Sequence, residues 1–179
     1  MFSKTQIQKN RLKYVLKKSK RFFIIGHAKP DGDSIGSTLA LYLALTRLGK
    51  KVTPACIDEL PGRFNFLPRA DKIKRLGNAI GDLQNSDALI MVDCGNFHLA
   101  GLESYQSNQS LPLLINIDHH HDNPRYGTIN IVEGDKSSTA EIAYNIIKSL
   151  GIEIDEQIAT CVLNGIFVDT DSFKNPNTS

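Results

Sequence analysis

The sequence predicts an α/β domain with an open, mainly parallel β-sheet flanked by helices. Short apolar runs of strand length alternate with longer segments of helical pattern along the 179 residues, and this alternation is typical of βαβ units. The runs are apolar at consecutive positions, as expected of strands buried on both faces. Hydrophobic residues form 41% and charged residues 22% of the chain, so one domain can bury a core without disulfides or a structural metal.

The first segment, residues 5–20, predicts an amphipathic helix whose inward positions are Ile7, Tyr14, Val15 and Leu16. Residues 1–21 contain eight Lys or Arg residues and no acid, which leaves 13 bases against 19 acids in the rest of the chain, a net charge of −6 there. Such a basic segment either forms a solvated helix face or attracts nucleic acid or another polyanion.

The run Phe22–Ile25 predicts the first strand, which ends at Gly26. A helix is expected at Ser34–Leu48, with Asp33 as its N-cap and Gly49 as its C-terminal stop. We then expect a strand at Val52–Ile57 and a loop at 60–70, where Pro61, Gly62 and Pro68 fall.

The second half of the chain continues the alternation. Its pattern predicts strands at Ala88–Val92, Leu113–Ile117 and Thr128–Val132, and helices at Ser138–Leu150 and Asp155–Val168 with Gly151 between them.

Three of the predicted strands are followed by residue types that bind metals. His27 comes just after the first strand, Asp93 directly after the third, and Asp118 with the histidines His119, His120 and His121 after the fourth. Because ligands of parallel sheets bind beyond the carboxyl ends of the strands, these side chains are expected to converge on one site.

The turn after the first strand adds two carboxylates. Pro30 disfavours helix at Lys29, and Gly32 lets the backbone bend so that Asp31 and Asp33 face one point. The helix start that follows suits phosphate, since Ser34, Gly36 and Ser37 are small enough for an anion to approach.

Four carboxylates, those of Asp31, Asp33, Asp93 and Asp169, are expected in this site. One like-charged pair about 4 Å apart costs about 4 kcal/mol at an effective dielectric constant of about 20, so several pairs exceed the stability of a typical domain. We therefore expect two divalent cations among them. Carboxylates with imidazoles favour Mn²⁺, with Mg²⁺, Co²⁺ or Zn²⁺ as alternatives, and two such ions can clamp a phosphate for attack by activated water.

Five motifs occur in the order HAKPDGDSIGS, VDCGN, IDHHHDN, SSTAE and GIFVDTDSF, and the resemblance that they carry spans about residues 7–179. Together they resemble the N-terminal catalytic domain of the DHH phosphoesterase superfamily, the RecJ-like enzymes. The resemblance is nearest to the oligoribonuclease (nanoRNase) branch, whose members also dephosphorylate 3′-phosphoadenosine 5′-phosphate. It implies an α/β domain with two Mn²⁺ ions.

The resemblance implies six metal ligands by position. His27 and Asp31 match ligands of one ion and Asp33 matches a ligand of the other; Asp93 and Asp169 match bridging ligands, and His119 matches a further ligand.

Two residues of the histidine motif are the predicted catalytic residues. His120 matches the histidine that contacts phosphate or lies beside an ion, and Asp118 is expected to orient a neighbouring histidine. The motif contains one histidine more than usual, His121. Its alignment with the family is fixed by Asp118, which directly follows the strand, and by Asn123 in the trailing asparagine position.

Four residues are predicted to bind substrate: Ser34, Ser37, Arg125 and Ser138. Ser138 with Glu141 also fits a capping box for the helix that follows, which is the structural alternative. His98 and His121 are expected to be surface or packing histidines without a role in the site.

The sequence departs from the family pattern twice. Asp171 replaces the usual glycine after Asp-Thr, and no glycine-rich GGGH-like motif of a second domain occurs in these residues. We therefore expect residues 1–179 to be a single catalytic domain in which 1–21 form the basic helix and 172–179 begin a linker to a substrate-binding domain.

The expected function is hydrolysis of phosphate mono- or diester bonds in short oligonucleotides or in 3′-phosphoadenosine 5′-phosphate. A cyclic-dinucleotide phosphodiesterase and a truncated module that binds metal and nucleotide with little turnover are the alternatives. Three scattered cysteines, Cys56, Cys94 and Cys161, favour a reducing cytoplasm. No apolar run is long enough to span a membrane, and a homodimer is a further expectation from the family.

Overall fold

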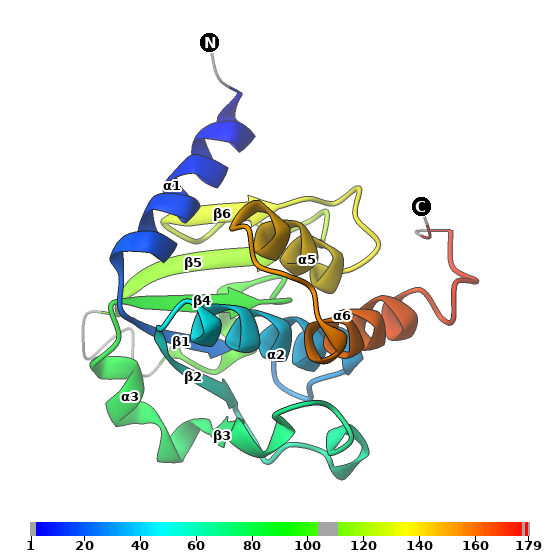
Figure 1. Ribbon diagram of the computed structural model, residues 1–179, viewed down its shortest axis with the longest axis horizontal. Helices are drawn as coiled ribbons and strands as arrows, with labels where there is room; N and C mark the ends of the chain where they lie inside the picture. The colour runs from blue at the N-terminus through cyan, green and yellow to red at the C-terminus, as the bar shows by residue number, and fades with distance from the viewer. Residues whose placement is uncertain (1–2, 104–110, 177, 179) are drawn as a thin grey trace.

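The computed structural model describes residues 3–103, 111–176 and 178. Its sheet has the strand order β3-β2-β1-β4-β5-β6, and every pairing in it is parallel (Figure 1). The strands are β1 (Arg21–Ile25), β2 (Lys51–Cys56), β3 (Lys74–Arg75), β4 (Ala88–Val92), β5 (Leu113–Asp118) and β6 (Ile129–Val132). The predicted fold class is confirmed.

Helices cover both faces of the sheet. They are α1 (Lys4–Lys18), α2 (Gly32–Arg47), α3 (Ile80–Gln84), α5 (Thr139–Ser149) and α6 (Glu156–Asp169). Single 3₁₀ turns lie at Gly62–Phe64, Ala70–Lys72, Leu76–Asn78 and Phe97–Ala100. In the described parts of the chain, no helix is both long and apolar enough to cross a membrane.

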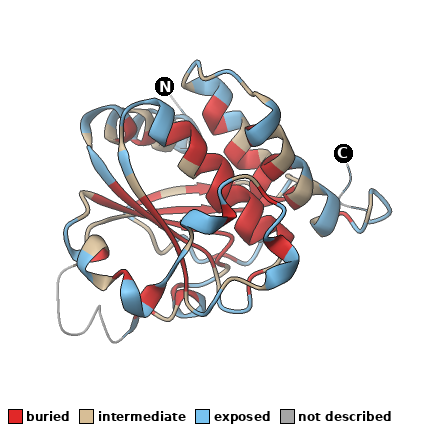
Figure 2. Cartoon of the chain, turned by 60° about the horizontal axis from the view of Figure 1, so that its bottom comes forward, coloured by how far each residue is buried: buried red, intermediate tan, exposed pale blue. Residues whose placement is uncertain are grey.

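The alternation of side chains along each strand divides the core into two layers. Ile24 of β1 and Ile90 of β4 point to the layer shared with α2, α5 and α6, whereas Phe23 and Met91 point to the layer shared with α3. Figure 2 shows the buried positions following the strands and the inner sides of the helices. Burial on both faces explains why these strands are apolar at consecutive positions.

The strand order reverses direction between β1 and β4, and parallel sheets bind ligands in a crevice at such a point. The chain runs outward from β1 through β2 to β3, then returns to β4 and continues to β6 on the other side. Neighbouring connections therefore leave the carboxyl ends of β1 and β4 in opposite directions, and side chains from both loops can face the crevice between them.

Two expectations about local structure were wrong, and two short elements were not predicted. Ile7 and Tyr14 of α1 are exposed, at 47% and 64%, because the helix packs through Leu12 and Leu16. The N-cap of α2 is Asp31, not Asp33: its carboxylate accepts hydrogen bonds from the backbone N–H groups of Asp33 and Ser34. The segment between β2 and β4 contains β3 and α3, which the sequence pattern did not indicate.

The chain turns sharply after α6. Asp171, Ser172 and Phe173 all adopt left-handed backbone conformations, with φ values of 45°, 60° and 65°. Such a conformation costs most residues about 1–2 kcal/mol and glycine little. The backbone thus gives a physical reason for a glycine at position 171.

Replacing Asp171 by Gly is therefore expected to raise the free energy of unfolding by about 0.5–1 kcal/mol, measured by urea denaturation. Asp171→Asn is the matched control, because it removes the charge while keeping a residue that tolerates this conformation about as well as Asp. If both variants gain equally, charge rather than backbone strain is the cause.

Candidate metal centre

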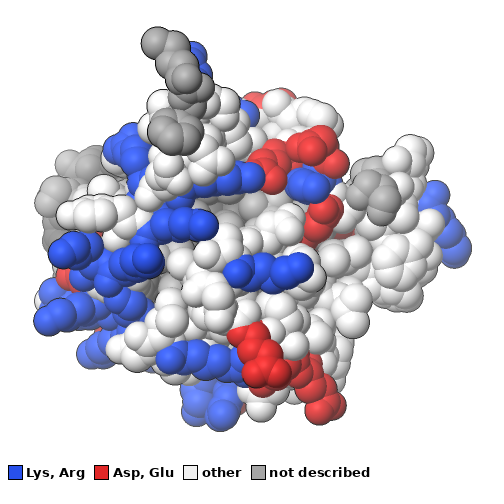
Figure 3. Space-filling model, turned by 45° about the horizontal axis from the view of Figure 1, so that its top comes forward, with Lys and Arg blue, Asp and Glu red and all other residues white. Residues whose placement is uncertain are grey.

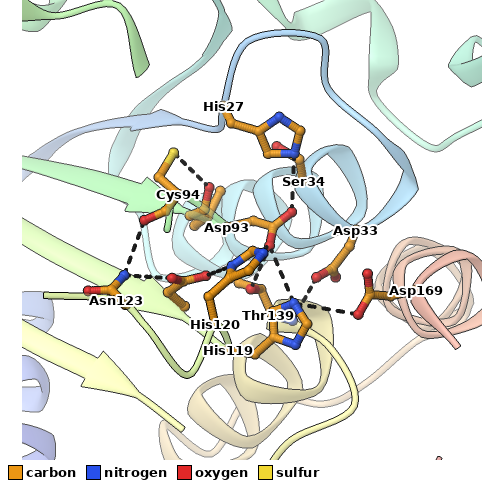
Figure 4. Close-up of polar contacts among 12 residues, drawn as sticks. His27, Asp33, Ser34, Asp93, Cys94, His119, His120, Asn123, Thr139 and Asp169 are labelled. Carbon is orange, nitrogen blue, oxygen red and sulfur yellow. Dashed lines mark hydrogen bonds and ion pairs between the residues drawn. The ribbon is translucent and has the colours of Figure 1, made fainter. Parts of the chain in front are cut away.

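Four segments bring carboxylates and imidazoles to the carboxyl edge of the sheet (Figure 4). His27 follows β1, and Asp31 and Asp33 lie at the start of α2. Asp93 follows β4, His119 and His120 follow β5, and Asp169 ends α6. The predicted convergence of these residues is what the structure shows.

Within this cluster, three groups each hold their ligand atoms within 4.8 Å of one another. They are His27, Asp31 and Asp93; Asp93, His119 and His120; and Asp33, His119 and Asp169. Asp93 and His119 each belong to two groups, so the three adjoin. Hard carboxylate oxygens with imidazole nitrogens are a donor set that suits Mn²⁺ and similar divalent ions.

Asp93 lies at the centre of the cluster and is almost fully buried. Its Oδ2 is 3.4 Å from His27 Nε2, and its Oδ1 is 3.8 Å from His119 Nε2. Its φ of 56° is left-handed, a conformation that Asp and Asn tolerate better than most residues. Strain of this kind is found where a site requires one orientation of a side chain.

Asp33 is fully buried and turns away from its own helix toward α5. Its two carboxylate oxygens accept the backbone N–H groups of Thr139 and Ala140 at 2.7 and 2.8 Å. The start of α5 is therefore occupied by a carboxylate, as the positive end of a helix dipole favours. This contact explains why Asp31, and not Asp33, caps α2.

Thr139 is a site residue that the sequence reasoning missed. Besides its N–H bond to Asp33, its Oγ1 donates to Asp93 Oδ1 at 3.1 Å. One buried residue thus holds two carboxylates, one at the start of α2 and the other just after β4. The SSTAE motif contains Thr139, but no local pattern distinguishes its hydroxyl from that of an ordinary helix-capping residue.

Replacing Thr139 by Val removes the hydroxyl that holds Asp93 and is expected to weaken Mn²⁺ binding about tenfold, measured by titration calorimetry. Thr160→Val is the matched control, because Thr160 Oγ1 donates to the Glu156 carbonyl within α6 and Thr160 belongs to none of the three ligand groups. Equal Mn²⁺ affinities of the two variants would contradict this role of Thr139.

Asp118 orients His120, as expected. Asp118 Oδ1 lies 2.7 Å from His120 Nδ1, while its Oδ2 accepts the Asn123 side-chain amide at 2.5 Å. Asn123 is buried and also donates to the Cys94 carbonyl. This chain of contacts ties His120 to the ends of β4 and β5.

The crowding of carboxylates and imidazoles raises the pKa values of three members of the cluster. Burial lowers the pKa of His27, but its contacts with Asp31 and Asp93 outweigh this and raise it to about 10. The contact with Asp118 raises the pKa of His120 to about 9. Burial, together with the charge of Asp93, raises the pKa of Asp33 well above its ordinary range. Protons thus take up charge that cations would otherwise balance.

The glycines of α2 and α6 let the helices approach closely enough to bring Asp33 near Asp169. A Cβ on Gly36 would lie 2.4 Å from the Cys161 carbonyl oxygen, and one on Gly165 would lie 2.8 Å from Asp33 Oδ1. Gly36 therefore serves helix packing, not anion access as the sequence suggested.

The four predicted substrate-binding residues lie in different surroundings. Ser34 is buried, and in the described parts of the chain its hydroxyl has no hydrogen-bond partner. Ser37 is buried one turn further along α2 and donates to the Ser34 carbonyl. Arg125 is exposed, and its guanidinium donates to the Val132 carbonyl at the end of β6. Because Ser37 is buried within α2, it does not reach the open side of the cluster.

Ser138, the fourth of these residues, is buried and caps α5 by accepting the Glu141 N–H at 3.1 Å. The Glu141 carboxylate reaches the N–H and hydroxyl of Ser137, one residue before the cap. The structural alternative for Ser138 is therefore observed, with the reciprocal bond shifted by one residue. His98 and His121 are exposed, as expected.

The open side of the cluster is a hollow of about 260 Å³. It is lined by His27, Asp31, Asp93, Leu99, His120 and Asp169. A small phosphorylated molecule can therefore reach the same oxygen and nitrogen atoms that would hold cations.

Comparison with known proteins gives one family and several relatives. Residues 21–166 match the model of the DHH family, N-terminal domain. A bifunctional oligoribonuclease and PAP phosphatase NrnA of Thermus thermophilus is 35% identical over 160 residues, which are 88% of this chain and 45% of that protein. A probable manganese-dependent inorganic pyrophosphatase of Bacillus licheniformis is 28% identical, over 87% of this chain and 50% of its own length.

The fold has a close structural counterpart. An exopolyphosphatase-related protein from Bacteroides fragilis superimposes with a TM-score of 0.90 at 24% identity, over 99% of this chain and 54% of that chain. This chain thus spans about half the length of the relatives that it matches.

Proposed function

The chain belongs to the DHH family, and on that premise we propose that it forms the metal-dependent phosphoesterase domain of an enzyme for short oligonucleotides or 3′-phosphoadenosine 5′-phosphate. The observation that supports this most is the set of three adjoining ligand groups around Asp93 and His119. The preference for nucleotides rests on the 35% identity to the bifunctional oligoribonuclease and PAP phosphatase.

Two divalent cations fit the donor set. In this proposal His27 and Asp31 would hold one, and Asp33, His119 and Asp169 would hold the other. Asp93 would contribute to both, because it lies 3.4 Å from His27 and 3.8 Å from His119. Such ions supply positive charge that stabilises phosphoryl oxygens and makes water more acidic.

The remaining residues of the cluster act on the substrate and on their neighbours. His120 lines the hollow, and since its Nδ1 is engaged by Asp118, Nε2 is the nitrogen available to a phosphoryl oxygen. The backbone amides of α5 keep Asp33 in place, and Thr139 does the same for Asp93. Orientation of this kind is what a site for in-line attack on phosphorus requires.

The test is to assay the purified chain with Mn²⁺ against a dinucleotide, 3′-phosphoadenosine 5′-phosphate and pyrophosphate, with the metal chelator EDTA as the blank. We expect faster release of product from the first two substrates than from pyrophosphate. A chimera that continues into the second half of the Thermus relative tests whether further residues are needed. If neither protein hydrolyses any substrate, the enzyme proposal is wrong.

A further inference from the structure

Basic side chains gather at the opposite edge of the sheet from the metal cluster. Figure 3 shows Lys and Arg over the side of the molecule where the strands begin. They come from three segments: Lys17 and Lys18 end α1, Lys20 precedes β1 and Arg21 opens it, and Lys50 precedes β2 and Lys51 opens it. The parallel register pairs Arg21 with Lys51, so residues 30 positions apart in the sequence form one surface, which we call the basic edge.

The basic edge contains a hollow of about 600 Å³. Lys20, Arg21, Lys50 and Lys51 line it together with Leu48 and Asp87. Asp87 is the one acid among these lining residues; its carboxylate accepts the backbone N–H groups of Lys20 and Arg21 at 2.7 and 2.9 Å and pairs with the Arg21 guanidinium at 3.2 Å. The charges of Lys20, Lys50 and Lys51 remain, so the lining is net positive. A positive hollow of this kind attracts anions from solution.

Hydrogen bonds of Lys50 join two segments of the basic edge. Lys50 Nζ donates to the Lys17 and Ser19 carbonyl oxygens at 2.8 and 2.7 Å. This contact fastens the end of α1 to the start of β2, so that the lysines at the end of α1 stay beside those of the strands. Side chains that are already positioned lose less conformational entropy when a ligand binds.

An exposed aromatic residue adjoins the basic edge. Tyr14 is 64% exposed, and helix geometry places it next to Lys17 and Lys18, three and four residues further along α1. The sequence pattern suggested an inward position for Tyr14, but Leu12 and Leu16 fill that face. An aromatic ring beside a positive groove is the arrangement with which proteins bind single-stranded nucleic acid, through base stacking and phosphate contacts.

From these observations we propose that the basic edge, together with Tyr14, binds the phosphate backbone and one base of single-stranded nucleic acid. It is separate from the proposed active site, because the five residues of β1 put about 13 Å between Arg21 and Ile25, and His27 lies two residues further on. A strand of several nucleotides can contact it, whereas a dinucleotide in the metal cluster cannot reach it.

The test measures the affinity of the chain for a fluorescein-labelled 12-nucleotide oligouridine RNA by anisotropy, in EDTA and at several KCl concentrations. The triple variant Lys18→Gln/Lys20→Gln/Lys51→Gln is expected to bind about tenfold more weakly at low salt. Its plot of log affinity against log salt should be less steep by about 2, since each lost phosphate contact removes about 0.7.

The matched control is Lys4→Gln/Lys72→Gln/Lys148→Gln, which removes the same charge elsewhere and should bind like the unmodified chain. Tyr14→Ala should bind about fivefold to a hundredfold more weakly without changing the salt dependence, because stacking does not release counterions. Because EDTA removes divalent metal, these results do not depend on the proposed hydrolysis.

Three results would overturn the proposal. The first is equal weakening in the two triple variants, since net charge alone would then explain binding. The second is failure of the unmodified chain to bind the RNA at low salt. The third is binding to phosphatidylserine vesicles, but not to RNA, that depends on the same three lysines, which would make the surface a membrane contact.

Discussion

Replacing Asp93 by Asn is expected to lower Mn²⁺ stoichiometry from two ions per chain to one and to reduce hydrolysis by about 10²–10³-fold or more. Asp93 shares a ligand group with His27 and Asp31, and its Oδ1 lies 3.8 Å from Nε2 of His119, a ligand proposed for the other ion. Its charge therefore contributes to both proposed ion positions. Asn keeps the size of the side chain, its tolerance of the left-handed backbone and its ability to accept the Thr139 hydroxyl. The fold should therefore survive.

The same variant gives a second readout in thermal unfolding. Without metal, Asp93→Asn should be at least as stable as the unmodified chain, because Asp93 is one of the charges that oppose ionisation of Asp33. Mn²⁺ at a thousand times its dissociation constant should stabilise the unmodified chain by about 4 kcal/mol and the variant by much less. Asp122→Asn, an equal charge change at an exposed position outside the ligand groups, is the control. Full activity of Asp93→Asn at limiting Mn²⁺ would show that the assignment is wrong.

Replacing Gly36 by Ala is expected to lower the free energy of unfolding by about 2–3 kcal/mol or more. The new Cβ would lie 2.4 Å from a backbone oxygen of α6 and 3.1 Å from the backbone nitrogen of Gly165. Backbone atoms within a helix cannot rotate aside as a side chain can, so α2 and α6 must separate. Because α2 carries Asp33 and α6 carries Asp169, Mn²⁺ binding should weaken in the same variant.

Gly81→Ala is the matched control, because nothing lies within 4 Å of the Cβ position at Gly81 in α3. It should leave stability unchanged or raise it by about 0.5–1 kcal/mol, the usual gain from Gly to Ala inside a helix. Urea denaturation of both variants measures the difference. Equal midpoints would mean that the close approach of α2 and α6 is not needed for stability.

The main strands and helices could be predicted because their signals are local. β4 has the bounds expected from its apolar run, β2 is shifted by one residue at both ends, and the other predicted strands differ by one residue at one end. β3 and α3 were missed because two charged residues and a five-residue helix carry no periodic signal. Tyr14 was misplaced because the inward face of α1 depends on how the helix lies against β6, which no local pattern encodes.

The cluster at the strand ends could be predicted because topology alone gathers it. A parallel sheet brings residues that follow β1, β4 and β5 to one edge whatever their separation in the sequence. The support of the cluster could not be predicted. Asp33 is held by Thr139 and Ala140, and Gly36 sets the distance between α2 and α6. Both are tertiary contacts between segments more than 100 residues apart in the sequence.

Anomalous diffraction from crystals grown with Mn²⁺ tests the proposed metal centre most directly. We predict two manganese peaks about 3.5–4 Å apart, one beside His27 and Asp31, the other beside Asp33, His119 and Asp169, with Asp93 contacting both. A single peak distant from Asp93, or none at saturating Mn²⁺, would contradict the account.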